Sequence, residues 1–202
     1  MLEKFAEWLV SWMLASQAFP KEDAPLVSFG ILQGLRTMIE IILMLLTGLF
    51  MNLLWQGALI LIAFMPLRIY AGGYHARTPM QCAVKTWLLF LGILLLYKFS
   101  PGLLGVQILL LIITGTSLWG FAPVEHENKP LEEYEVIKYR KLAFGIYGAE
   151  TVLFVMLRLL GAAGIARCIV LGMVMMLVVM WIGVGMNKGC EVDMVLFRGK
   201  RK

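Results

Sequence analysis

Long stretches without a charged residue are the feature that most limits how this chain can fold. Three of them are Ile41–Leu67, Phe99–Val124 and Cys168–Asn187, and each is near or above the ~20 residues that a helix needs to cross a bilayer. The composition agrees, because 60% of the residues are hydrophobic and only 15% are charged, against about 25% charged in soluble domains. We therefore predict an all-α integral membrane protein.

Polar breaks between the apolar stretches divide the chain into about six transmembrane helices. We predict the spans at about Leu26–Phe50, Asn52–Met65, Cys82–Phe99, Leu103–Phe121, Leu142–Leu160 and Ile165–Met186. Polar loops are predicted at Pro66–Gln81 and Ala122–Lys141. The break near Asn52 has an alternative, in which one span over Met38–Met65 replaces the first two and leaves five crossings.

The N-terminal segment Leu2–Phe19 has the pattern of an amphipathic helix. Phe5, Trp8 and Trp12 recur at three- and four-residue spacing, and acidic residues lie on the opposite side. Such a helix is too polar to span and suits the headgroup region of a bilayer. It is not expected to be a cleavable signal, because no small-residue cleavage site follows a compact apolar stretch.

We predict a single membrane-embedded domain over residues 1–202. It would consist of the amphipathic helix (1–20), a helical bundle (26–186) and a basic cytoplasmic tail (187–202).

The net charge of +5 and the pI of about 9.2 are explained by topology better than by nucleic-acid binding, because the cations lie in the polar segments. Lys and Arg accumulate on the cytoplasmic side of membrane proteins. The basic tail and the second polar loop are therefore predicted to be cytoplasmic. Six spans then place both termini and the loop Pro66–Gln81 on that side.

That first loop holds the residues best suited to chemistry. A cysteine protease needs a thiolate and an imidazole that exchanges protons with it, and His75 stands seven residues before Cys82. On an unbroken helix the two would lie about 10.5 Å apart, which is too far for a hydrogen bond. Gly72, Gly73 and Pro79 are positions where the backbone can break. The spacing permits a catalytic dyad but does not require one.

Plainer interpretations apply to several of these residue types. A cysteine at a helix end is usually a small packing residue, and a histidine in a polar loop is often only solvated. Cys168 is interpreted as packing, Cys190 as a tail thiol and His126 as a solvated loop residue. No cofactor or metal is expected, because neither an HxxxH nor a CxxC arrangement is present.

The first loop also resembles a known family. The pattern Arg68-x-x-x-Gly72-Gly73-x-His75-Ala76, followed by Cys82, is similar to the signature of the accessory gene regulator B (AgrB) family of quorum-sensing endopeptidases. The resemblance extends to chain length, to the order of spans and loops, and to the segment Ala122–Leu131, which resembles that family's Ala-Pro…Lys-Pro segment.

The resemblance implies that His75 and Cys82 are the catalytic pair and that Arg68, Gly72 and Gly73 support it. The substrate would be a small AgrD-like precursor peptide with an amphipathic leader, a signal sequence and an acidic tail. Cys82 would form a thioester with the signal sequence, and a Cys or Ser of the precursor would then close a thiolactone or lactone ring. The expected partners are this precursor and the lipid bilayer, with no nucleic acid, and a homodimer is compatible with the resemblance.

Three questions stay open at this level. A third catalytic residue is not evident, and the candidates are Gln81, Glu125 and Glu150. The cations that could attract the acidic tail, but could equally serve only topology, are Lys129, Lys138, Arg140 and Lys141. The alternative function is a small transporter or channel, with Glu150 lining a polar path together with Arg36 and Glu40, two residues that could also pair on one helix face.

Overall fold

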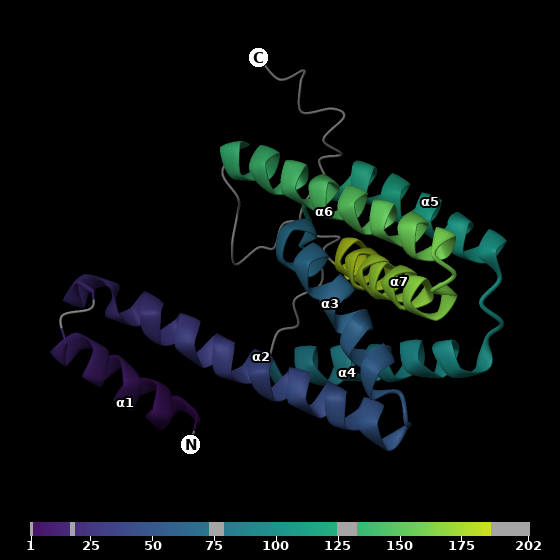
Figure 1. Cartoon of the computed structure of the whole chain (residues 1–202). Helices are drawn as coiled ribbons and strands as arrows, with labels where there is room; N and C mark the ends of the chain where they lie inside the picture. The colour runs from purple at the N-terminus through teal and green to yellow at the C-terminus, as the bar shows by residue number, and fades with distance from the viewer. Residues whose placement is uncertain (1, 17–18, 73–78, 125–132, 187–202) are drawn as a thin grey trace, which may run out of the picture. The chain divides into compact units, whose positions relative to one another are not determined.

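The computed structural model describes residues 2–16, 19–72, 79–124 and 133–186, and this part of the chain is helical (Figure 1). The elements are α1 (Leu2–Ala15), the short 3-10 helix η1 (Lys21–Asp23), α2 (Ala24–Phe50), α3 (Leu54–Ala71), α4 (Pro79–Phe99), α5 (Leu104–Phe121), α6 (Glu133–Leu159) and α7 (Ala163–Met186). Six helices are long and apolar enough to cross a membrane, and no strand occurs among the described residues. The predicted all-α membrane class with about six spans is confirmed.

The chain divides into two compact units, Met1–Leu46 and Thr47–Lys202. In the first unit α1 lies beside α2 (Figure 1), and Arg36 of α2 is 3.9 Å from Glu3 of α1. The sequence considered a pairing of Arg36 with Glu40, whereas the ion pair that the described residues show for Arg36 is the one with Glu3. Such an exposed ion pair contributes only about 0–1 kcal/mol.

α1 confirms the predicted amphipathic helix, although it ends at Ala15 instead of continuing to Phe19. Its small residues Ala6 and Val10 are buried, whereas Trp8 and Trp12 are 60% and 62% exposed. An aromatic face left open on a short helix suits the headgroup layer of a bilayer.

The break between the first two spans falls where the sequence predicted it. Asn52 has a positive φ of 58°, a conformation that Asn tolerates better than most residues. The Leu53 N–H donates to the Gly48 carbonyl at 2.7 Å, and the Asn52 N–H donates to the Leu49 carbonyl at 3.0 Å. These two hydrogen bonds form a Schellman cap. The alternative of one span over Met38–Met65 is thus wrong.

The centre of the second unit is α7, against which α3, α4, α5 and α6 all pack (Figure 1). Buried residues make up 72% of the most apolar stretch of α7 and at most 39% of that stretch in the unit's other spans. The α3–α7 crossing is the closest. A Cβ built on Gly172 would lie 2.7 Å from both the Ala63 Cβ and the Ile60 carbonyl oxygen. Small residues permit this approach between membrane helices, where lipid supplies no hydrophobic force.

Polar contacts hold the two ends of α7. Arg167, near its start, donates to the Leu96 carbonyl at 2.9 Å and the Ser100 carbonyl at 2.7 Å, so it holds the turn from α4 to α5. Near the other end, the Trp181 indole N–H donates to the Ser117 hydroxyl of α5 at 3.1 Å. These hydrogen bonds thus join α7 to the turn between α4 and α5 near one end and to α5 near the other.

The predicted boundaries of two loops are wrong. The loop expected at Pro66–Gln81 is shorter, because α3 continues through Pro66 to Ala71 and α4 begins at Pro79. The loop expected at Ala122–Lys141 is also shorter, since α6 begins at Glu133. Both helices extend beyond their apolar stretches.

Candidate functional site

The site begins with Arg68, which lies in the last turn of α3. Its Nη1 donates to the Gly72 carbonyl oxygen at 2.6 Å, which satisfies one of the carbonyls left open at a helix C-terminus. The same guanidinium makes a side-chain hydrogen bond with the Cys82 sulfur. Arg68 therefore joins the end of α3 to the beginning of α4.

Gly72 ends α3 in a conformation that few other residues can adopt, with φ 73° and ψ −148°. It forms an isolated parallel bridge with Val124, whose N–H donates to the Ala71 carbonyl at 3.0 Å. A Cβ on Gly72 would collide with the Val124 carbonyl oxygen. Glycine at this position thus allows the segment after α3 to meet the segment after α5.

Cys82 lies in the first turn of α4 and is half-buried, with its sulfur in no disulfide. The sequence placed it at a loop boundary, but Pro79 is the first helical residue, where the missing N–H of proline does no harm. The Thr86 hydroxyl donates back to the Cys82 carbonyl at 2.9 Å. The thiol is therefore held near the partially positive end of a helix.

The structure thus brings together Arg68, Gly72 and Cys82 from the sequence-based set. His75 and Gly73 lie outside the described residues, so the pairing of His75 with Cys82 stays a prediction. The contribution of Val124 was not foreseen, because the contact is made by backbone atoms and no side-chain type signals it.

Comparison with protein families identifies the class of protein. The family model described as Accessory gene regulator B matches residues 2–181. The chain belongs to the AgrB family. Members of this family are peptidases that process the AgrD precursor into the autoinducing peptide of quorum sensing. No curated protein and no solved structure matches the chain.

Family membership confirms the expected peptidase class and an AgrD precursor as substrate, in a protein with several candidate membrane spans. It leaves no role for the transporter alternative. The roles of individual residues in this AgrB-family chain are not given by the match and rest on the geometry above.

The other residues considered for the catalytic site lie in several parts of the chain. Gln81 is exposed in the first turn of α4, one residue before Cys82. Glu150 lies within the span of α6, where its Oε2 is buried and has no hydrogen-bond partner among the described residues. Glu125 and His126 lie outside the described residues.

The basic residues assigned to the precursor tail divide into two kinds. Lys138 and Lys141 are exposed on α6. Arg140 instead donates to the Trp119 carbonyl of α5 at 2.6 Å and so holds the two helices together. Lys129 lies outside the described residues. Lys138 and Lys141 are thus available on α6 to contact the precursor tail, whereas Arg140 already binds the Trp119 carbonyl.

Proposed function

We propose that Cys82 is the nucleophile and His75 the proton-transfer residue of this AgrB-family peptidase. The observation that carries the proposal is the double contact of Arg68, with the Gly72 carbonyl and with the Cys82 sulfur. Because one guanidinium contacts both Gly72 and Cys82, the two ends of the segment between these residues lie close together. His75 belongs to that short connection. The helix that carries Cys82 begins at Pro79, after His75, so the separation of about 10.5 Å on one continuous helix does not apply to the pair.

Positive charge lies near Cys82. The Arg68 guanidinium is beside the thiol, and the N-terminal turn of α4 adds the partial positive charge of a helix end. Arg68 is a positioning residue in this proposal, because it holds the sulfur and the backbone of Gly72 and has no assigned contact with substrate.

The chemistry follows in two steps. The Cys82 thiolate attacks the carbonyl carbon between the signal and the acidic tail of the precursor, and protonated His75 gives its proton to the departing amine. The tail leaves, and the signal remains as a thioester on Cys82. A Cys or Ser side chain of the precursor then loses its proton to His75 and attacks the thioester. A thiolactone or lactone ring closes, and the Cys82 thiolate is released.

We also assign the capture of the acidic tail to Lys138 and Lys141. Tyr139, which stands between them, meets Tyr70 of α3 edge-on, with ring centroids 6.0 Å apart. Tyr70 is two residues before Gly72, so this part of α6 lies beside the end of α3 that carries the site. Exposed cations at that place would attract an anionic peptide. Lys129 is added to this set from its position in the sequence.

The experiment that tests the dyad co-expresses the AgrD precursor with Cys82→Ala, His75→Ala or the control Cys168→Ala. Cys168 is buried in α7, so its variant tests whether loss of any thiol matters. We expect mass spectrometry to show no tail release with the first two variants and normal release with the control. Tail release by Cys82→Ala or His75→Ala would overturn the corresponding assignment.

The thioester is tested separately with a precursor whose ring-closing Cys or Ser is replaced by Ala. This precursor can form the acyl-enzyme but cannot cyclise, so intact-protein mass spectrometry should detect the signal sequence attached to Cys82. Tail release without any such adduct would exclude the proposed intermediate.

We further propose that the site and both termini face the cytoplasm, because the basic residues gather on that side. A cysteine at Lys138 should react with a membrane-impermeant thiol reagent only after the cells are permeabilised. A cysteine at Lys98, at the opposite end of α4, should react in intact cells. The reverse labelling pattern would invert the topology. The homodimer also stays a proposal, which in-membrane crosslinking tests.

A further inference from the structure

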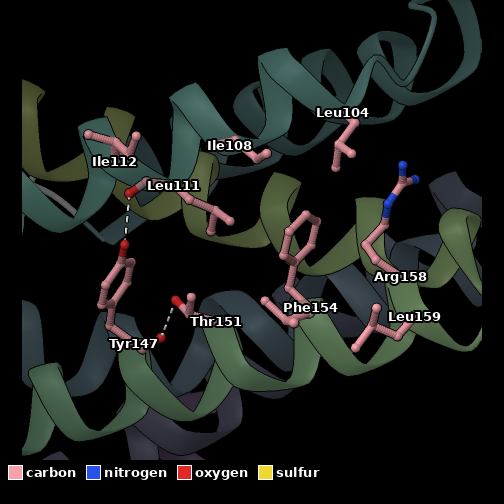
Figure 2. Close-up of a pocket in the computed structure, with 10 residues that line it drawn as sticks. Leu104, Ile108, Leu111, Ile112, Tyr147, Thr151, Phe154, Arg158 and Leu159 are labelled. Carbon is pink, nitrogen blue, oxygen red and sulfur yellow. Dashed lines mark hydrogen bonds between the residues drawn. The ribbon is translucent and has the colours of Figure 1, made fainter.

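A groove lies between α5 and α6, outside the peptidase site (Figure 2). It has a volume of about 400 Å³, which is within the range of small-molecule sites. Its apolar walls include Leu104, Ile108 and Ile112 of α5 and Phe154, Val155 and Leu159 of α6. All of these side chains except Phe154 are exposed on two candidate spans, so in a bilayer hydrocarbon is the solvent beside the groove.

The two ends of the groove differ in chemistry. At one end the Tyr147 hydroxyl donates to the Leu111 carbonyl at 2.9 Å and closes the space between the helices. At the other end the Arg158 guanidinium extends between the two helices (Figure 2). Among the residues that the structure describes, no partner is recorded for this guanidinium.

The length of the groove matches one leaflet of a bilayer. Tyr147 and Arg158 are 158 − 147 = 11 residues apart on α6, which corresponds to about 16 Å along the helix axis. One leaflet contributes about half of the ~30 Å hydrocarbon thickness. Arg158 is next to the end of α6 at Leu159, and α5 begins at Leu104, so the guanidinium lies at the level of the lipid headgroups.

We propose that this groove binds one anionic phospholipid, with an acyl chain between α5 and α6 and the phosphate on Arg158. A guanidinium binds phosphate through charge-assisted hydrogen bonds, and the apolar walls exclude a polar occupant from the rest of the space. A precursor peptide at Cys82 would be engaged near the other end of these helices, where Val124 follows α5. The lipid site is therefore separate from the peptidase site.

The lipid would complete the packing of α5 on α6. Arg140 and Tyr147 already connect the two helices at the end nearer the peptidase site. From Tyr147 toward Arg158, the groove takes the place of direct contact between α5 and α6. An acyl chain there supplies the van der Waals contacts that the helices do not make with one another.

The test uses the full-length protein in nanodiscs that contain equal amounts of phosphatidylglycerol and phosphatidylcholine. Native mass spectrometry then measures the lipid retained after release into the gas phase. We expect the wild type to retain one phosphatidylglycerol in preference to phosphatidylcholine. Arg158→Gln should reduce this retention about tenfold, which corresponds to the loss of one charge-assisted contact.

Matched variants separate the groove from general effects. Lys98→Gln removes an exposed cation at the same end of the bundle and should leave retention unchanged. Ile108→Trp fills the groove and should abolish retention, whereas Leu109→Trp, at an exposed neighbouring position outside the lining, should not.

Three results would overturn the proposal. The first is that the wild type retains the two lipids equally. The second is that Arg158→Gln and Lys98→Gln retain equal amounts of phosphatidylglycerol. The third is that Ile108→Trp retains as much phosphatidylglycerol as the wild type. If Ile108→Trp slowed precursor processing without changing the bound lipid, the groove would belong to the substrate instead.

Discussion

Replacing Gly72 with alanine is the most direct test of how the site is built. At φ 73° and ψ −148° the backbone is in a region used almost only by glycine, and a side chain there costs on the order of 1–3 kcal/mol. The added Cβ would also meet the Val124 carbonyl oxygen, so the chain can relieve the strain only by giving up the bridge. If this free energy is added to the activation barrier of precursor processing, the processing rate should fall by roughly 5- to 150-fold.

Two control variants isolate the cause. Gly161 also has a positive φ, of 79°, but a Cβ on it would meet no described atom within 4 Å, so Gly161→Ala carries conformational strain without a collision. Gly92→Ala, in the interior of α4, carries neither.

The assay measures the initial rate of tail release from the precursor in membrane vesicles that contain equal amounts of each variant. The detergent-solubilised melting temperature is recorded in parallel. We expect a large loss of rate for Gly72→Ala and near wild-type rates for both controls. A wild-type rate for Gly72→Ala, or a loss no larger than that of Gly161→Ala, would refute the view that the bridge to Val124 positions the site.

Two further predictions concern Arg68 and the helix crossing. Arg68→Lys keeps the charge but loses the planar fork that reaches both Gly72 and Cys82, so tail release should slow about tenfold; a rate within about twofold of wild type would contradict the positioning role. Gly172→Ala would press a Cβ against the α3 backbone 2.7 Å away, at a cost of about 1–3 kcal/mol. The melting temperature should fall by ~2–10 °C, whereas Gly185→Ala, with no close atom around its Cβ, should melt like the wild type.

The sequence predicts the number of spans well because burial in lipid acts on long stretches of side chains. The turn at Asn52 was also predictable, since one polar residue that tolerates positive φ interrupts a long apolar stretch. Helix ends were harder. Polarity marks the place where a helix leaves the hydrocarbon, whereas backbone hydrogen bonding decides where it stops. This is why α3 continues past Pro66 to Ala71, and why Lys138 lies on a helix instead of in a loop.

The candidate site was predictable only in part. Cys82 and Arg68 were identified by residue type and by their resemblance to a family pattern. The bridge between Gly72 and Val124 was not, because it joins the backbones of segments that lie more than fifty residues apart in the sequence, and backbone pairing leaves no mark in side-chain chemistry. The glycine was recognised as a flexible point, although in the structure it acts as a point of close contact.

The central place of α7 has a consequence for how this protein is made. Synthesis proceeds from the N-terminus, so α3 and α4, which carry Arg68 and Cys82, enter the bilayer before the helix on which both of them pack. Until Ala163–Met186 has been inserted, the surfaces of these earlier helices that later face α7 have only lipid or each other as neighbours. Arg68, Gly72 and Cys82 of the proposed site are therefore encoded in the first half of the chain, whereas Val124, which bridges Gly72, and the supporting packing on α7 come later. We therefore expect the proposed site to gain its full packing only after Ala163–Met186 has been inserted.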